Sequence, residues 1–449
     1  MRIRSRRGFT PALFACLLIL PLVWASCGGD STSQQDALLD GTPQQSGILT
    51  SNAEACSEQE RVAAPAVTPE EITSLVRGDS DFAFDLYRLL SEGDENLFFS
   101  PHSISVALAM AYAGACGDTE REMAAALSFL LPQERLHPAF NALDLALTDP
   151  GRVATEETGE AFQFNIVNAL WGQDGYQFLP PFLDTLAENY GAGMRLVDFQ
   201  RDWEGAREMI NAWVADQTEE RITELLPQGI IDAATRLVLT NAIYFKASWL
   251  FPFPRENTAD GPFRLLDGST VQTPMMKLDA RTLYGEVDGV QAVELPYTGF
   301  QYSAYVVVPA EGEFEEFERT LNAEAVEAIL DSLGDAQVKL TMPKFEFESS
   351  SNLNETLKAL GMPLAFNPEK ADFSGMDGTR GLSIADVVHK AFVSVDEEGT
   401  EAAAATAVVM HTSLPPPAEL VVDRPFLFLI RHNQTGTILF VGRVLDPTA

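Results

Sequence analysis

The chain has 449 residues, 46% hydrophobic and 21% charged, so it can build the core of one large domain or of a few small ones. Its formal net charge of −35 argues against nucleic-acid binding, which needs clustered lysine and arginine, and it predicts a solvated exterior. Cys16, Cys27, Cys56 and Cys116 show no CxxC pair and no metal-ligand spacing, so we predict neither a disulfide framework nor a metal site.

Residues 1–26 are predicted to be a secretion signal. Four arginines precede an apolar stretch that ends near Trp24 and is short for a membrane span. The sequence Ala-Ser-Cys-Gly-Gly that follows the apolar stretch resembles a bacterial lipoprotein processing site, with Cys27 as the lipidated residue. Trp24 is a departure, because leucine is usual at that position. We therefore expect a secreted chain, extracellular or periplasmic, that meets the bacterial membrane only through this lipid anchor. The alternative is an ordinary signal peptide with an unmodified Cys27.

Residues 27–70 are rich in Ser, Thr, Gln, Asp, Ala and Pro and have few large apolar side chains. This composition predicts a flexible tether. A denser apolar pattern follows, so residues 71–449 are predicted to form a single domain.

Apolar periodicity places helices first and most strands later in this domain. Helical spacing is found in residues 72–92, 103–115 and 203–222. Strand-like runs are 235–245, 301–309, 337–348, 426–430 and 437–444, and the last two are predicted to pair as a hairpin. The run 426–430 is apolar at every position, which indicates burial on both faces. This order favours an α+β fold.

No catalytic motif is apparent. The five histidines have no metal-site spacing, and neither HExxH, GxSxG nor a phosphate-binding GKS/T loop occurs. We predict that the protein is not an enzyme and needs no cofactor, although a triad assembled from distant residues stays open.

Several motifs occur in an order that resembles the serpin family across residues 71–449. They are NLFFSPHSI at 96–104, TNAIYFK at 240–246 with Trp249 beyond it, VHKA at 388–391, and DRPF at 423–426 with the final hairpin. Each motif alone is weak, but the ordered set is specific. The resemblance implies a monomer with about nine helices around three β-sheets and an exposed reactive-centre loop at about residues 397–420.

The resemblance also assigns roles to single residues. Ser100, Ser103, Asn241 and His389 map onto the shutter, a polar cluster beneath the centre of the main sheet. Trp249 maps onto the breach, where the loop first enters. A neutral histidine donates at one ring nitrogen and accepts at the other, which suits a link between strands that later separate.

The function implied is suicide-substrate inhibition of serine proteases, with cysteine proteases as a second target class. A protease attacks the exposed loop and forms an acyl-enzyme, and the cut loop then inserts into the main sheet and traps it. The alternative is a noninhibitory serpin that acts as a binding protein or chaperone.

The hinge of this loop has residues that suit insertion. They are Glu398, Gly399, Thr400, Glu401, Ala402, Ala403, Ala404, Ala405 and Thr406. If Thr400 points inward, strand alternation sends small side chains inward and leaves the Glu401 charge outside. Gly399 gives the backbone freedom, and no proline occurs before Pro415. Local propensity alone would favour a helix here.

The position of the bait bond can be located by counting along the sequence in two ways. Sixteen places after Glu397 stands Ser413, followed by Leu414, whereas counting back from residues 423–426 gives Leu414, which Pro415 disfavours. Met410, His411 and Thr412 are alternatives. The window has no Arg or Lys, which argues against trypsin-like targets. Ser413 predicts an elastase- or subtilisin-like protease, and Met410 or Leu414 a chymotrypsin-like one.

Heparin is not expected as a cofactor. Some serpins bind heparin through a basic helix, but the corresponding region here, TEREMAAALSFLL, has a single Arg121.

Overall fold

The structure is a computed structural model that describes residues 53–148, 163–400 and 417–449. Three sets of predicted site residues lie outside these ranges. They are the lipidation residue Cys27, the hinge residues Glu401, Ala402, Ala403, Ala404, Ala405 and Thr406, and the bait-bond residues Met410, His411, Thr412, Ser413 and Leu414.

Ten α-helices occur in the described part of the chain, against about nine predicted. They are α1 (Pro69–Leu90), α2 (Pro101–Tyr112), α3 (Gly117–Ala126), α4 (Gln133–Leu147), α5 (Pro180–Tyr190), α6 (Phe199–Gln217), α7 (Phe314–Thr320), α8 (Ala323–Asp331), α9 (Asn354–Leu360) and α10 (Ser374–Asp377), besides the 3-10 turns η1 (Arg255–Asn257) and η2 (Pro363–Phe366). The first helix begins with a capping box, in which the side chains of Thr68 and Glu71 each accept a hydrogen bond from the other residue's backbone N–H. None of the described helices is long and apolar enough to cross a membrane.

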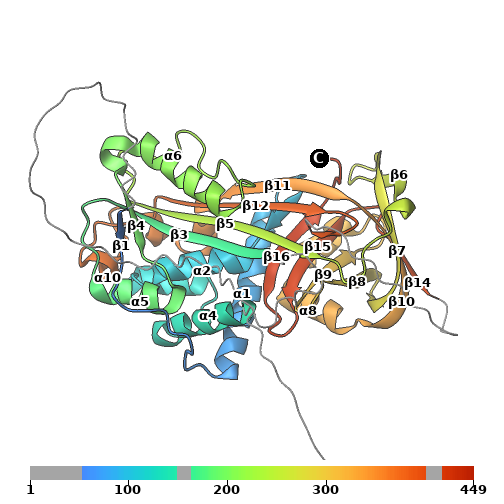
Figure 1. Cartoon of the computed structure of the whole chain (residues 1–449), viewed down its shortest axis with the longest axis horizontal. Helices are drawn as coiled ribbons and strands as arrows, with labels where there is room; N and C mark the ends of the chain where they lie inside the picture. The colour runs from blue at the N-terminus through green and yellow to red at the C-terminus, as the bar shows by residue number, and fades with distance from the viewer. Residues whose placement is uncertain (1–52, 149–162, 401–416) are drawn as a thin grey trace, which may run out of the picture. The chain divides into compact units, whose positions relative to one another are not determined.

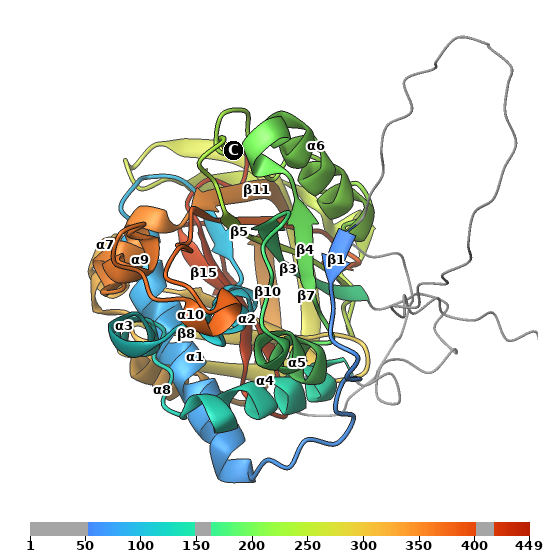
Figure 2. The ribbon, with the colours of Figure 1, turned by 90° about the vertical axis from the view of Figure 1, so that its left-hand side faces the viewer.

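The main sheet has seven strands and runs through the centre of the domain (Figure 1). In spatial order they are β1 (Ala53–Ala55), β4 (Met194–Val197), β3 (Gln163–Gln173), β5 (Leu237–Ser248), β13 (Gly399–Thr400), β12 (Asp386–Val395) and β11 (Phe345–Asn352). Both faces are covered, by α6 on one side and by α1, α2, α4 and α5 on the other (Figure 2). The α6 side has its own apolar core, which includes Val167, Ile210 and Val238.

A second sheet has nine strands. They are β14 (Ala418–Val421), β10 (Gly334–Pro343), β7 (Thr270–Val287), β8 (Val290–Pro296), β9 (Tyr302–Val308), β15 (Phe426–His432), β16 (Ile438–Val444) and β2 (Leu97–Phe99), with β6 (Ala259–Arg264) beside β7. Three sheets were expected, but the described residues form two. The 18-residue β7 makes the second sheet continuous, because it pairs with β6 and β10 and also with β8.

The predicted α+β class and the C-terminal hairpin are confirmed. Strands β15 and β16 pair antiparallel, and all five residues of 426–430 are buried, as their continuous apolar run indicated. Helices α1, α2 and α6 cover most of the three segments predicted to be helical.

The predicted tether ends earlier than residue 70, so that boundary needs correction. β1 pairs antiparallel with β4 at the edge of the main sheet, from Ala53 opposite Leu196 to Ala55 opposite Met194 (Figure 2). Further along, Arg61 Nε donates to Asn141 Oδ1 at 2.8 Å. Residues 53–68, which we call the N-terminal strap, therefore lie on the domain.

Candidate functional site at the opening of the main sheet

Strands β5 and β12 are paired along part of their length and separated at one end. They run parallel and pair directly from Val238 opposite Asp386 to Ile243 opposite Ala391. Beyond this point β13 lies between them, with Thr400 paired to Ala247 on one side and to Val395 on the other. We call this pairing of Thr400 the first rung.

The predicted shutter residues meet where the two strands still pair. His389 lies opposite Asn241, and its Nδ1 contacts the Oδ1 atom of that side chain. The Ser100 backbone N–H donates to His389 Nε2 at 3.2 Å. Nε2 is thus the acceptor, so Nδ1 carries the proton and donates to Asn241. Burial lowers the pKa of His389 to about 3, which keeps the ring neutral.

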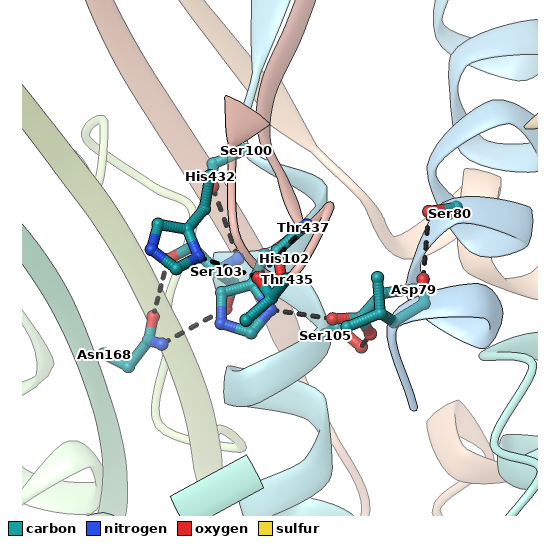
Figure 3. Close-up of polar contacts among 11 residues, drawn as sticks. Asp79, Ser80, Ser100, His102, Ser103, Ser105, Asn168, His432, Thr435 and Thr437 are labelled. Atoms are coloured by element: carbon teal, nitrogen blue, oxygen red, sulfur yellow. Dashed lines mark hydrogen bonds and ion pairs between the residues drawn. The ribbon is translucent and has the colours of Figure 1, made fainter. Parts of the chain in front are cut away.

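Asn168 of β3 completes this cluster and was not predicted. Asn241 Nδ2 donates to Ser103 Oγ at 2.5 Å and to Asn168 Oδ1. Asn168 Nδ2 in turn donates to the Ser103 carbonyl at 3.1 Å (Figure 3). The structure therefore brings all four predicted shutter residues into one hydrogen-bond network. A lone polar residue in the apolar run IVNALW was the signal that could have revealed Asn168.

Trp249, the predicted breach residue, contacts the turn that joins β12 to β13. Its ring stacks on Tyr297, with centroids 4.6 Å apart and planes 13° apart. Its backbone N–H donates to the Glu398 carbonyl at 2.9 Å, and its Nε1 donates to the Asp396 carbonyl at 3.0 Å. The indole therefore fixes the turn through the backbone.

The turn itself is closed by its own residues. Asp396 N donates to the Gly399 carbonyl at 3.0 Å, while Asp396 Oδ1 accepts from the backbone N–H groups of Glu398 and Gly399 at 2.8 and 3.2 Å. Thr400 then points inward, since it is only 2% exposed, and its Oγ1 lies 2.7 Å from the Tyr297 hydroxyl. Burial raises the pKa of Tyr297 well above its usual range, so that hydroxyl stays protonated.

Two consecutive buried carboxylates of the turn are each paired with a cation. Glu397 accepts from Lys344 Nζ and from Thr258 Oγ1, both at 2.7 Å. Burial by itself would raise the pKa of Glu397, but these hydrogen bonds outweigh it and leave that pKa below its ordinary value. Glu398 forms an ion pair with Arg255. Sequence reasoning missed both cations.

A second buried polar cluster has a serine, a histidine and an aspartate, but not in catalytic order. His102 Nδ1 and Ser105 Oγ each lie 2.7 Å from a different oxygen of Asp79 (Figure 3). In a hydrolase triad the histidine stands between the serine and the aspartate. Here Asp79 stands in the middle, and all three side chains are buried. The described residues also hold no group of three or more His, Cys, Asp or Glu suited to a metal.

Comparisons with known proteins agree with the motifs and the fold. A family model described as "Serpin (serine protease inhibitor)" matches residues 77–447. The chain belongs to the serpin family. An uncharacterised serpin-like protein of Thermococcus kodakarensis is 41% identical over 377 residues, which cover 83% of this chain and 86% of that protein. The leukocyte elastase inhibitor of Homo sapiens is 39% identical over 385 residues, or 83% of this chain and 99% of that protein.

A solved structure shows the same architecture. Human thyroxine-binding globulin, determined in complex with thyroxine, superposes with a TM-score of 0.75 at 31% identity, over 84% of this chain and 100% of that one. The predicted serpin fold is thereby confirmed. The names of these relatives cover both an inhibitor of an elastase and a protein that binds a small molecule.

Proposed function

We propose that this serpin is a suicide-substrate inhibitor of serine proteases. The observation that carries the proposal is the first rung. Thr400 is paired between β5 and β12 and points inward, which supports a main sheet that accepts the hinge between these two strands. Further insertion would extend a hairpin whose turn is already closed.

The register of the first rung predicts where each loop residue would arrive. Both ladders at Thr400 are antiparallel, so six residues further along the loop correspond to six residues back along β5 and β12. Thr406 would then lie opposite Asn241 on one side and His389 on the other. Insertion must therefore break the shutter hydrogen bond, and a threonine hydroxyl would arrive where the freed groups need a partner.

The side chains of the hinge suit this register. Ala402 and Ala404 would follow Thr400 on the inward face, where the sheet has least room. Glu401 would face solvent, and a shift by one residue would bury its charge at a cost of several kcal/mol.

The target class follows from the bait bond. We propose the Ser413–Leu414 bond as the site of attack, by an elastase- or subtilisin-like protease, with a chymotrypsin-like enzyme next. The likeness to relatives named leukocyte elastase inhibitor supports an elastase-like target. The lack of Arg and Lys among residues 402–423 argues against trypsin-like enzymes.

We also propose that the protein is secreted and lipid-anchored at Cys27. The basic and apolar leader and the small residues around Cys27 support this. In cells fed radiolabelled palmitate, the wild-type protein should take up label and the Cys27→Ser variant should not. Equal labelling of both would contradict the anchor.

One assay tests the inhibitory function. The domain from Ala53 onward is incubated with elastase, subtilisin, chymotrypsin or trypsin, and the products are separated on denaturing gels. A covalent band that survives denaturation is expected with one of the first three enzymes, and not when the protease serine has been blocked beforehand. Cleavage without any such band in every reaction would contradict trapping and favour the noninhibitory alternative.

A further inference from the structure

We propose that Arg255 is a positioning residue that holds the first rung closed in the uncleaved protein and so speeds loop insertion. This inference rests on the proposed inhibitory function, because it names a residue that would set how efficiently a protease is trapped.

Residues 249–258, which follow β5, enclose the turn from one side. Two backbone N–H groups of this segment, from Trp249 and Phe253, donate to the Glu398 and Glu397 carbonyls at 2.9 and 2.8 Å. The segment also supplies Arg255 to the Glu398 carboxylate. The turn is therefore held through both backbone and side chains.

Within this segment, Arg255 is the residue that compensates the charge of a nearly buried carboxylate. The Glu398 side chain is 10% exposed, whereas the Arg255 side chain is 69% exposed and reaches back over it from η1. A carboxylate so nearly buried needs a compensating cation, because its desolvation is otherwise uncompensated. Glu397 has a different cation, Lys344, so the loss of Arg255 leaves Glu398 alone without a charge partner among the described residues.

The two ion pairs grip the turn from different elements. Arg255 belongs to η1, and Lys344 lies between β10 and β11. The two cations therefore hold adjacent carboxylates of one turn from two separate elements. Without the Arg255 contact the turn should open more often, and Val395 then separates from Thr400.

Opening the turn should slow insertion. The hairpin that full insertion extends begins with this turn and this rung, and closing a loop before its contacts form is entropically unfavourable. If the turn must close first, loop insertion becomes slower relative to deacylation of the acyl-enzyme. More of its molecules are then cleaved and released as substrate.

The test compares Arg255→Gln with Arg319→Gln, which breaks an exposed arginine–glutamate pair on α7 far along the chain. Hydrogen exchange of a peptide covering residues 393–400 should be about fivefold faster in Arg255→Gln only, as expected for losing one such charged contact. The number of inhibitor molecules consumed per trapped protease should rise in the same variant. The charge swap Arg255→Glu with Glu398→Arg should restore both values.

Each outcome decides the inference. Unchanged exchange in Arg255→Gln overturns it, and so does faster exchange with unchanged stoichiometry. A swap that restores neither value also overturns it, because the pair would then not be the cause. If the wild-type protein traps no protease, the proposed function fails, while the exchange comparison still shows whether Arg255 holds the rung.

Discussion

At the scale of single residues, His389 links two strands without carrying a charge. It donates to Asn241 on β5 and accepts from the Ser100 backbone, and its ring is buried. A neutral link between β5 and β12 can break without leaving an ion in the core. The family motifs pointed to His389, Asn241 and Ser100, and the structure supplied the tautomer of the ring.

The lowered pKa of His389 predicts a loss of stability in mild acid. In the unfolded chain the ring titrates near 6.5, whereas in the folded chain its pKa is about 3. The unfolded state therefore binds the extra proton between these values, and stability that is complete above pH 6.5 falls as the pH drops. Between pH 7 and pH 5 this amounts to about 2 kcal/mol.

Urea unfolding at both pH values measures this effect. The His389→Gln variant should lose less free energy of unfolding on acidification than the wild type. His137→Gln should behave similarly, because burial also lowers the pKa of His137, to about 4. An identical pH dependence in wild type and His389→Gln would show that the ring does not titrate in this way.

Thr400 allows a second residue-scale prediction. Thr400→Arg places an unpaired charge at a position that is 2% exposed, which costs several kcal/mol in the inserted state. The variant should be cleaved as a substrate and form little covalent complex. Thr400→Ser, which keeps the hydroxyl near Tyr297, should trap normally. A Thr400→Arg variant with wild-type stoichiometry would mean that our insertion register is wrong.

At the scale of elements, the N-terminal strap connects the edge of the main sheet to the helices beneath it. Arg61 Nη2 contacts Asp144 of α4 at 2.5 Å, and Val62 N donates to the Glu188 carbonyl of α5 at 2.9 Å. Composition did not predict this packing, because the strap has few large apolar residues. The residues that the strap contacts lie far from it in the sequence, and these contacts are polar.

Removing the arginine of the strap should destabilise the domain measurably. Arg61 bonds to both Asn141 and Asp144 in a half-buried setting, so Arg61→Ala should lower the free energy of unfolding by about 1–2 kcal/mol. Arg88→Ala is the matched control, because its pair with Asp85 is about half exposed and worth little. Equal urea midpoints for the two variants would argue against a stabilising role of the strap.

At the scale of the whole molecule, loop cleavage should stabilise the protein. About ten further residues would join the main sheet, each with a net hydrogen-bond gain of about 1 kcal/mol. For a domain of this size, the thermal midpoint should rise by on the order of 10 °C. Calorimetry before and after cleavage measures the shift, and cleaved Thr400→Arg should show a much smaller one. No rise in the cleaved wild type would contradict insertion.

The sequence predicted the family and fold because motifs distributed over the domain occur in the serpin order. It also pointed to Ser100, Ser103, Asn241, His389 and Trp249, since each stands in such a motif, and their shutter and breach roles stay predictions. Arg255, Lys344 and Asn168 escaped prediction because their roles depend on partners 50 to 150 residues away. Continuity of the second sheet was missed too, because strand periodicity does not show that one long strand pairs with several neighbours.

The gap above the shutter has a consequence for how the protein meets other copies of itself. Among the described residues, no ladder joins β5 to β12 between the pairs at Ile243 and Ala247, so two strand edges face each other inside a sheet. Unpaired edges are templates for strands of other chains. Thr400 pairs with both strands at the end of this opening, so the first rung leaves a shorter stretch of unpaired edge for a neighbouring molecule to pair with.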